Sequence, residues 1–185
     1  MEQFIKVLAE FEDLGGKGIV YGGCLRDTVT GYGPVKDIDI AVQNTKDNLL
    51  AIVAFYTTYG SSHLEQYIGY GNFPDVFASV QVERPDAPTV NFVVLSDDFP
   101  FTPTDVAERC DFGICQIAMD SFGLTYRTGA FAADLANYTF TYTREPFDQA
   151  QFERSLRRWD RFSQRYVGWR LVVPAYDTFG LALAS

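Results

Sequence analysis

Two neighbouring segments near the N-terminus constrain the fold of this chain most strongly. Gly18 to Tyr21 has the composition of a short strand and runs directly into Gly22-Gly23, after which a helix is expected from Cys24 to Thr30. Asp37 to Val42 then alternates acidic with apolar residues, which is the period of a strand, so its two carboxylates face the same side. This close succession of strand, helix and strand predicts an α/β chain.

The rest of the sequence continues the α/β pattern and then becomes helical. We expect a mixed sheet flanked by helices over residues 1–143, followed by a short helical segment over residues 144–185. Apolar periodicity and turn residues predict helices over Phe4–Leu14, Thr45–Tyr59 and Asp148–Tyr166, a helical turn over Asp105–Cys110, and strands over Val76–Glu83, Thr89–Leu95, Ile114–Met119 and Gly123–Tyr126. Leu171 to Ala184 is expected to be a helix or strand packed on the core.

Composition narrows the classes of protein to which the chain can belong. Hydrophobic residues make up 47% of the sequence, which is enough for a packed core. No apolar run reaches the roughly 20 residues of a membrane helix, and the N-terminus lacks the pattern of a secretory signal. The three cysteines are odd in number and lack the C-x-x-C spacing of zinc sites. We therefore expect a cytoplasmic protein with no membrane partner and no disulfide-linked partner.

The charges of the chain are unevenly distributed. The net charge of −9 by itself argues against a nucleic-acid partner. Residues 1–143, however, carry eight basic and nineteen acidic side chains, a net of −11, whereas residues 144–185 carry seven arginines and five acids, a net of +2. On the predicted helix, arginines at three- and four-residue steps would form a basic stripe suited to phosphate. The alternative is a solvent-exposed face balanced by Glu153 and Asp160.

The strand from Asp37 to Val42 is the first candidate for chemistry. Asp37 and Asp39 face the same way, and two anions so close repel each other unless a cation lies between them. Mg²⁺ accepts one or two carboxylates and completes its shell with water and substrate phosphates. Two such ions, with Mn²⁺ as a substitute, could activate a hydroxyl and stabilise departing pyrophosphate. Taken alone, a D-x-D pair is more often an ordinary solvated strand face.

The glycine pair upstream is the second candidate. Gly22-Gly23 joins a strand to a helix, so bare backbone N–H groups at a helix N-terminus are available to phosphate oxygens. Arg26 follows one helical turn later and could point toward the same anion. The alternative is that the glycines only form a tight turn and that Arg26 pairs with Asp27. The acidic strand shortly downstream favours the phosphate-binding interpretation.

In order along the chain, these residues resemble the motifs of a known family. Gly22-Gly23-Cys24-Leu25-Arg26-Asp27, then Gly31, then Asp37-Ile38-Asp39 resembles the G-G-x-x-R-D…G…D-x-D signature of the polymerase-β-like nucleotidyltransferase superfamily, in particular the head of class II tRNA CCA-adding enzymes and bacterial poly(A) polymerases. Later matches, in family order, are Glu108–Phe112 to its R-R-D-F motif, Ala133–Leu135 and Tyr142–Arg144 to its G-G-x-x-D-L…R segment, and Arg154–Arg157 with Arg161-Phe162 to its R-x-L-R-x-x-R-F helix.

The resemblance implies a nucleotidyltransferase-type fold, with a catalytic head over residues 1–143 and a truncated, Arg-rich, neck-like segment over residues 144–185. It implies metal-dependent transfer of a nucleotidyl group from a nucleoside triphosphate to a hydroxyl, with an RNA 3′ end such as that of tRNA favoured as acceptor. Asp37 and Asp39 would be the catalytic, metal-binding carboxylates. The residues expected to contact the nucleotide are Gly22, Gly23, Arg26, Asp27, Arg109, Asp111, Arg154 and Arg157. On the predicted helix, Arg154 and Arg157 would point inward, and Arg158 and Arg165 outward. RNA would be contacted by Arg158, Arg161 and Arg165.

Three departures from the family pattern bear on this expectation. Cys110 stands where the second motif has an arginine, and Ala150 and Gln151 stand where the base-selecting E-D-x-x-R motif has acids. Asn91 occupies the later strand on which a third carboxylate is common, with Glu83 as a substitute on the partner strand. Because of these changes, one alternative is that the chain is a catalytically inactive relative that binds a nucleotide or a protein. A toxin-type or phage-encoded transferase that modifies tRNA, a protein or a small molecule inside a bacterial host is a further alternative.

Overall fold

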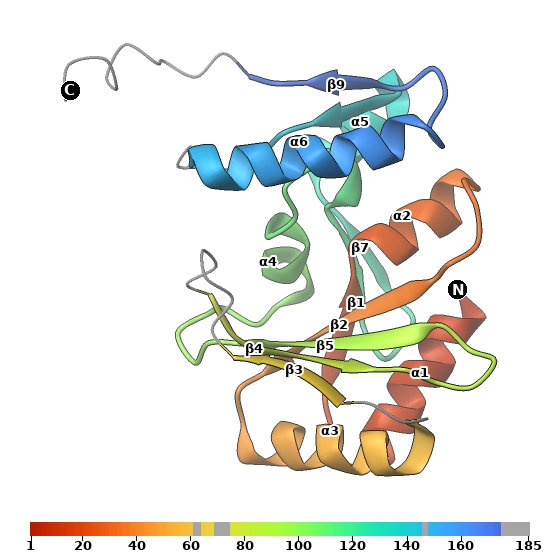
Figure 1. Ribbon diagram of the computed structural model, residues 1–185, viewed down its shortest axis with the longest axis vertical. Coiled ribbons are helices and arrows are strands. Elements are labelled where there is room, and N and C mark those ends of the chain that lie inside the picture. The colour runs from red at the N-terminus through yellow and green to blue at the C-terminus, as the bar shows by residue number, and fades with distance from the viewer. Residues whose placement is uncertain (61–63, 69–74, 146–147, 175–185) are drawn as a thin grey trace.

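The computed structural model describes residues 1–60, 64–68, 75–145 and 148–174 of the chain, with only the backbone for residues 64–68 (Figure 1). Its centre is a mixed seven-stranded sheet with the order β3-β4-β5-β2-β1-β6-β7. The strands are β1 (Gly18–Tyr21), β2 (Asp37–Gln43), β3 (Leu64–Ile68), β4 (Val76–Val82), β5 (Thr89–Leu95), β6 (Ile117–Met119) and β7 (Thr125–Arg127). Only β2 and β5 run parallel, and the other neighbours are antiparallel.

Helices lie on both sides of this sheet (Figure 1). On one side are α1 (Glu2–Glu12) and α3 (Lys46–Tyr59), and on the other are α2 (Gly23–Thr30) and α4 (Pro103–Glu108). Beyond α2 and α4 lies a further layer made of α5 (Gly129–Asn137), α6 (Gln149–Ser163) and the parallel pair β8 (Thr139–Thr141) and β9 (Arg170–Val172). A short 3-10 helix, Gly113–Cys115, connects α4 to β6. No helix in the described ranges is long and apolar enough to cross a membrane.

The alternation of β2 assigns its residues to the two faces of the sheet. Ile38 and Ile40 are fully buried and belong to the main core, where Phe11 and Phe92 lie with ring centroids 4.7 Å apart. Ala41 faces the opposite way and packs in a second cluster with residues of α4. Asp39 has the same parity as Ala41, so it faces the α4 side, half-buried, at the end of the apolar strip. The aspartates of β2 are thereby excluded from the main core.

The last layer is anchored to the rest of the molecule through α6. This helix begins after Asp148, whose carboxylate accepts a hydrogen bond from the backbone N–H of Gln151 at 2.6 Å. Its apolar side chains join the main core, where the rings of Phe140 and Phe162 stack with centroids 5.5 Å apart. The described part of the segment after residue 143 is therefore packed against the preceding residues and shares their core.

The predicted α/β class, with a mixed sheet flanked by helices and a C-terminal helical segment, is confirmed. The strands and helices expected from periodicity are present, with ends shifted by a few residues. Four elements were not predicted: β3, α5, β8 and the 3-10 helix Gly113–Cys115, which takes the place of the first part of the strand expected over Ile114–Met119. Of the element expected over Leu171 to Ala184, the described part confirms a strand, β9, while residues 175–185 lie outside the described ranges.

Candidate active site

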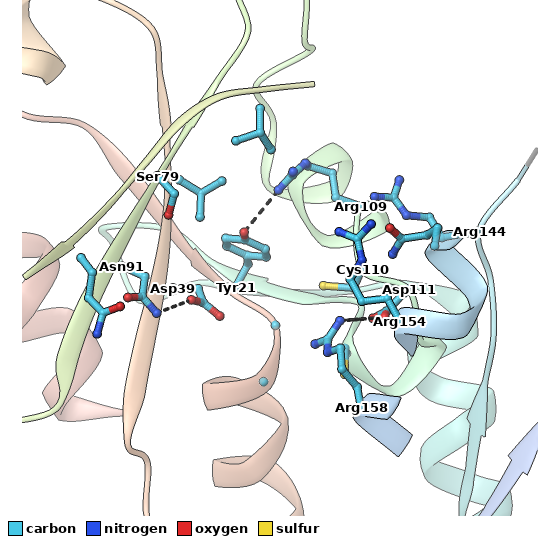
Figure 2. Close-up of a pocket in the computed structure, with 17 residues that line it drawn as sticks. Tyr21, Asp39, Ser79, Asn91, Arg109, Cys110, Asp111, Arg144, Arg154 and Arg158 are labelled. Atoms are coloured by element: carbon cyan, nitrogen blue, oxygen red, sulfur yellow. Dashed lines mark hydrogen bonds and ion pairs between the residues drawn. The ribbon is translucent and has the colours of Figure 1, made fainter. Parts of the chain in front are cut away.

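A pocket of about 400 Å³ opens between the sheet and α6 (Figure 2). One wall consists of side chains from β2, β4 and β5, and the opposite wall carries Arg109, Arg144, Arg154 and Arg158. Gly22 and Gly23 also belong to its lining. The volume is within the range typical of small-molecule sites, about 300–1,000 Å³.

Asp39 is the carboxylate that β2 contributes to the pocket. Its Oδ1 accepts a hydrogen bond of 3.0 Å from the amide Nδ2 of Asn91, its register partner on β5 (Figure 2). Burial raises the pKa of Asp39, and the neighbouring charge of Asp37 raises it further, whereas the bond from Asn91 and the field of Arg158 act in the opposite direction. Asp37 is exposed at the start of the strand and lies outside the pocket lining.

The glycine pair forms the turn from β1 into α2. Gly22 has a φ of 78°, which disfavours any side chain, and it is the residue that precedes the first turn of α2. A Cβ at this position would lie 3.6 Å from the sulfur of Cys110, so the thiol lies close to the turn. Burial raises the pKa of Cys110 well above its ordinary value, so this thiol stays neutral. The glycine turn and the neutral thiol of Cys110 therefore lie next to each other in the pocket lining.

Two of the pocket arginines are held by carboxylates, the half-buried Asp75 and the buried Asp111. The Arg109 side chain bonds Asp75 through Nε at 2.5 Å and donates from Nη1 to the hydroxyl of Tyr21 at 3.2 Å. Arg158 donates from Nη1 to both oxygens of Asp111, at 2.6 and 2.7 Å. These ion pairs fix the positions of the guanidinium groups, which reduces the entropy that ligand binding would cost.

Arg26, expected to bind phosphate, does not line the pocket. Its side chain is 2% exposed, and Nη2 lies 2.6 Å from Oδ1 of Asp27. Nε also donates to the hydroxyl of Tyr166 at 2.9 Å, and the guanidinium lies 4.3 Å from the ring centroid of Phe162. The alternative considered from the sequence, pairing of Arg26 with Asp27, is the arrangement in the structure. Both residues are interior groups that join α2 to the end of α6.

The arginines of α6 are also distributed differently from the prediction. Arg154 and Arg158, one helical turn apart, line the pocket, whereas Arg157 is exposed outside it. The expectation that Arg157 points inward and Arg158 outward therefore disagrees with the structure. Arg161 is exposed, and Arg165 donates to Oδ2 of Asp27 at 3.1 Å. Within α6, the exposed arginines are thus Arg157 and Arg161.

A third carboxylate does not join the aspartate pair. Glu83 follows the last residue of β4, is exposed, and lies outside the pocket lining. Within the described ranges, no group of three or more His, Cys, Asp or Glu side chains gathers closely enough to hold a metal ion. The residue beside Asp39 on the adjacent strand is the neutral Asn91.

Comparison with solved structures relates this geometry to known proteins. The Thermotoga maritima CCA-adding enzyme complexed with tRNA matches 96% of the chain with a TM-score of 0.63 and 18% identity. The Bacillus stearothermophilus CCA-adding enzyme in complex with CTP matches 92% with a TM-score of 0.59 and 18% identity. A CCA-adding enzyme with ATP matches 91% with a TM-score of 0.61 and 19% identity.

This chain has a nucleotidyltransferase fold. The resemblance inferred from the motifs is confirmed at the level of the fold. The chain spans 38 to 40% of the length of those three structures. It therefore resembles one part of them, the head domain that carries the nucleotidyltransferase fold. The sequence itself matches no protein-family model and no curated protein sequence.

Several pocket residues of this nucleotidyltransferase fold were not predicted as site residues. They are Tyr21, Ser79, Gln81, Arg144 and Gln151. Ser79 and Gln81 could have been found from the two-residue period of β4, which places polar residues on one face between apolar ones. Arg144 falls within a segment that resembles a family motif, but nothing local indicates that it faces the pocket.

Proposed function

We propose that this chain binds a nucleoside triphosphate in the pocket and transfers its nucleotidyl group to a hydroxyl acceptor. The observation that carries the proposal is the arrangement of the pocket, in which Asp39 faces a wall of arginines across the glycine turn of α2 (Figure 2). Arginines and helix N-termini are the groups that bind phosphate oxygens. The fold shared with CCA-adding enzymes supports the same conclusion.

The proposed reaction is a displacement at the α-phosphorus. The acceptor oxygen forms a new bond to the α-phosphorus, the bond from that phosphorus to the bridging oxygen of the β-phosphate breaks, and pyrophosphate leaves while the hydroxyl proton passes to solvent. The arginine wall would hold the triphosphate and the leaving pyrophosphate. Asp39, on the opposite wall, would position the acceptor hydroxyl. The packing of α6 over the pocket would exclude water from the reacting groups.

Asp37 and Asp39 are the two carboxylates of β2 that would hold a divalent ion, without a third protein carboxylate beside them among the described residues. Asp37 and Asp39 have the same parity on the strand and interact electrostatically, since the charge of Asp37 raises the pKa of Asp39. Carboxylates suit Mg²⁺ or Mn²⁺, and triphosphate oxygens would complete the coordination. When bound, the metal would neutralise triphosphate charge and polarise the reacting hydroxyl. A second ion would have to share the same two carboxylates, because the neighbouring strand offers Asn91.

The neutral Asn91 favours a second candidate function. A relative that binds nucleotide without transferring it would need the arginine wall and the glycine turn but not a complete set of acids. The two candidates differ in one measurement. Purified protein would be incubated with each labelled nucleoside triphosphate, Mg²⁺ and total cellular RNA or lysate. Label transferred to an acceptor supports the enzyme, whereas nucleotide binding without transfer supports the inactive relative.

Replacing Arg154 with Ala is expected to weaken triphosphate binding by about 1.5–3 kcal/mol, the range of a charged hydrogen bond. Arg157→Ala is the matched control, since Arg157 lies on the same helix and is exposed outside the pocket. Nucleotide titration by calorimetry measures both. Equal losses of affinity in the two variants would mean that the pocket is not the triphosphate site.

The exposed arginines of α6 support an RNA 3′ end as the acceptor. If RNA lies along this face, the logarithm of affinity should fall linearly with the logarithm of salt concentration, by roughly 0.7 per phosphate neutralised on a single strand. The double variant Arg157→Ala/Arg161→Ala is expected to reduce that slope by about 1.4. Filter binding of single-stranded RNA over a salt series measures it. An unchanged slope, or no RNA binding at low salt, would exclude this face as an RNA contact.

A further inference from the structure

A row of polar side chains extends the site across the sheet beyond Asp39. In the strand register, Asp39 pairs with Asn91 on β5, and Asn91 pairs with Gln81 on β4. Ser79 lies on the same face of β4 as Gln81, beside Val93. All of these side chains line the pocket, and Figure 2 shows Ser79 and Asn91 on the side of Asp39 that faces away from the arginines.

This strand wall differs in charge from the opposite wall. The cations that line the pocket among the described residues are Arg109, Arg144, Arg154 and Arg158. They come from the residue after α4, from the segment between β8 and α6, and from α6. On β4 and β5, the described lining residues are Ser79, Gln81, Asn91 and the two valines Val76 and Val93. A phosphate would find no cation on this wall, whereas an uncharged group with several hydrogen-bonding atoms would find partners.

The polar groups of the strand wall have unused hydrogen-bonding capacity. Asn91 gives its Nδ2 to Asp39 and keeps its Oδ1 available. Among the described residues, no protein group hydrogen-bonds to the hydroxyl of Ser79 or to the amide of Gln81. All three side chains are half-buried. Each offers a donor, an acceptor or both toward the pocket, with an apolar surface from Val93 between them.

We propose that Ser79, Gln81 and Asn91 form the acceptor subsite and that they bind the cis-diol of a ribose. This inference rests on the proposed nucleotidyl transfer. The two vicinal hydroxyls of a ribose each donate and accept, which matches two amides on adjacent strands, and the sugar carbons can pack on Val93. A serine or tyrosine of a protein substrate presents one hydroxyl and would leave part of this wall without partners.

The proposed subsite explains how the pocket separates its two substrates. The triphosphate occupies the arginine wall and the ribose occupies the neutral wall, so the reacting hydroxyl lies beside Asp39 between them. The ribose can belong to the 3′ end of an RNA or to a free nucleoside, since both present the same diol. The experiment below separates these two sources.

Binding of two probes tests the subsite, with the nucleotide site filled by a non-hydrolysable ATP analogue. The first probe is a fluorescent RNA oligonucleotide with a terminal 2′,3′-diol, compared with the same oligonucleotide ending in a 2′-deoxyribose. The second is adenosine, which carries no phosphate. We expect the wild-type chain to prefer the diol, and Gln81→Ala to weaken diol binding about three- to tenfold while abolishing the preference. Ser79→Ala should act in the same direction.

The controls distinguish this inference from the proposed function. Gln43→Ala places the same substitution at the exposed opposite end of β2 and should leave both probes unaffected. Affinity for the ATP analogue should be unchanged in all three variants. If the wild-type chain did not bind the ATP analogue, that result would contradict the proposed function and not the subsite. Binding of the oligonucleotide but not adenosine identifies RNA as the source. Equal affinity for diol and deoxy ends, or full diol preference in Gln81→Ala, would overturn the subsite.

Discussion

Replacing Asp39 with Asn is expected to lower nucleotidyl transfer by at least about a thousandfold, equivalent to ~4 kcal/mol of transition-state stabilisation. The substitution removes the negative charge proposed to hold the metal but keeps the shape, since the new amide oxygen can still accept the hydrogen bond from Asn91. Single-turnover incorporation of a labelled nucleotide measures the rate. Asp37→Asn is expected to act in the same way, and Asp13→Asn, an exposed position after α1, is the matched control.

Stability provides the check that the Asp39→Asn variant is folded. The pKa of Asp39 is raised in the folded protein, first by burial, so the ionised form destabilises the fold above the unfolded pKa of about 3.9. The metal-free variant should therefore melt at a slightly higher temperature than wild type at pH 7, and this gain should vanish as the pH falls below that value. Wild-type turnover in Asp39→Asn would exclude the catalytic assignment.

Replacing Arg26 with Ala is expected to destabilise the protein by about 3–5 kcal/mol, because it leaves the buried carboxylate of Asp27 without its closest cation. It also removes the bonds from Arg26 to Tyr166 and to the sulfur of Cys115, at 2.9 and 3.1 Å. Denaturant unfolding measures the change. Arg157→Ala, at an exposed position, should change stability by no more than about 0.5 kcal/mol.

A double variant separates the ion pair from the loss of packing. Arg26→Met/Asp27→Asn removes both charges while keeping most of the volume, so it should destabilise less than the sum of the two single substitutions. If Arg26→Ala instead unfolds like wild type and loses only triphosphate affinity, the arginine is a phosphate ligand and its buried position in the structure is not the one used in binding.

Much of the fold and part of the site followed from local patterns. The two-residue period of β2 was sufficient to place its aspartates opposite the core residues Ile38 and Ile40, because side chains alternate on every strand. The glycine pair was sufficient to predict the turn into α2, because few residues tolerate its backbone conformation. By contrast, α5 carries a low proportion of the polar residues that reveal a helix period, and β3 and β8 are short, so nothing local distinguished them.

The arginines of α6 show where local patterns were insufficient. Helical periodicity alone puts Arg154 and Arg158 on one face and Arg157 and Arg161 on another, but it does not say which face meets the pocket. Packing decides this, because the buried Ser155 and the aromatic ring of Phe162 orient the helix on the core. The inward pair is then Arg154 and Arg158, and Arg158 reaches Asp111.

The sequence by itself determined the local features on which the proposed function rests: the alternating aspartates, the glycine turn, and a group of arginines in an otherwise acidic chain. Each of these is a property of residues close together along the backbone. Tertiary structure decided which of them meet. It buried Arg26 against Asp27 and brought the arginines of α6 opposite Asp39. Through the register of strands far apart in the chain, it also set Asn91 beside Asp39 and Gln81 beside Asn91. Such pairings depend on packing and strand register, which no local periodicity encodes.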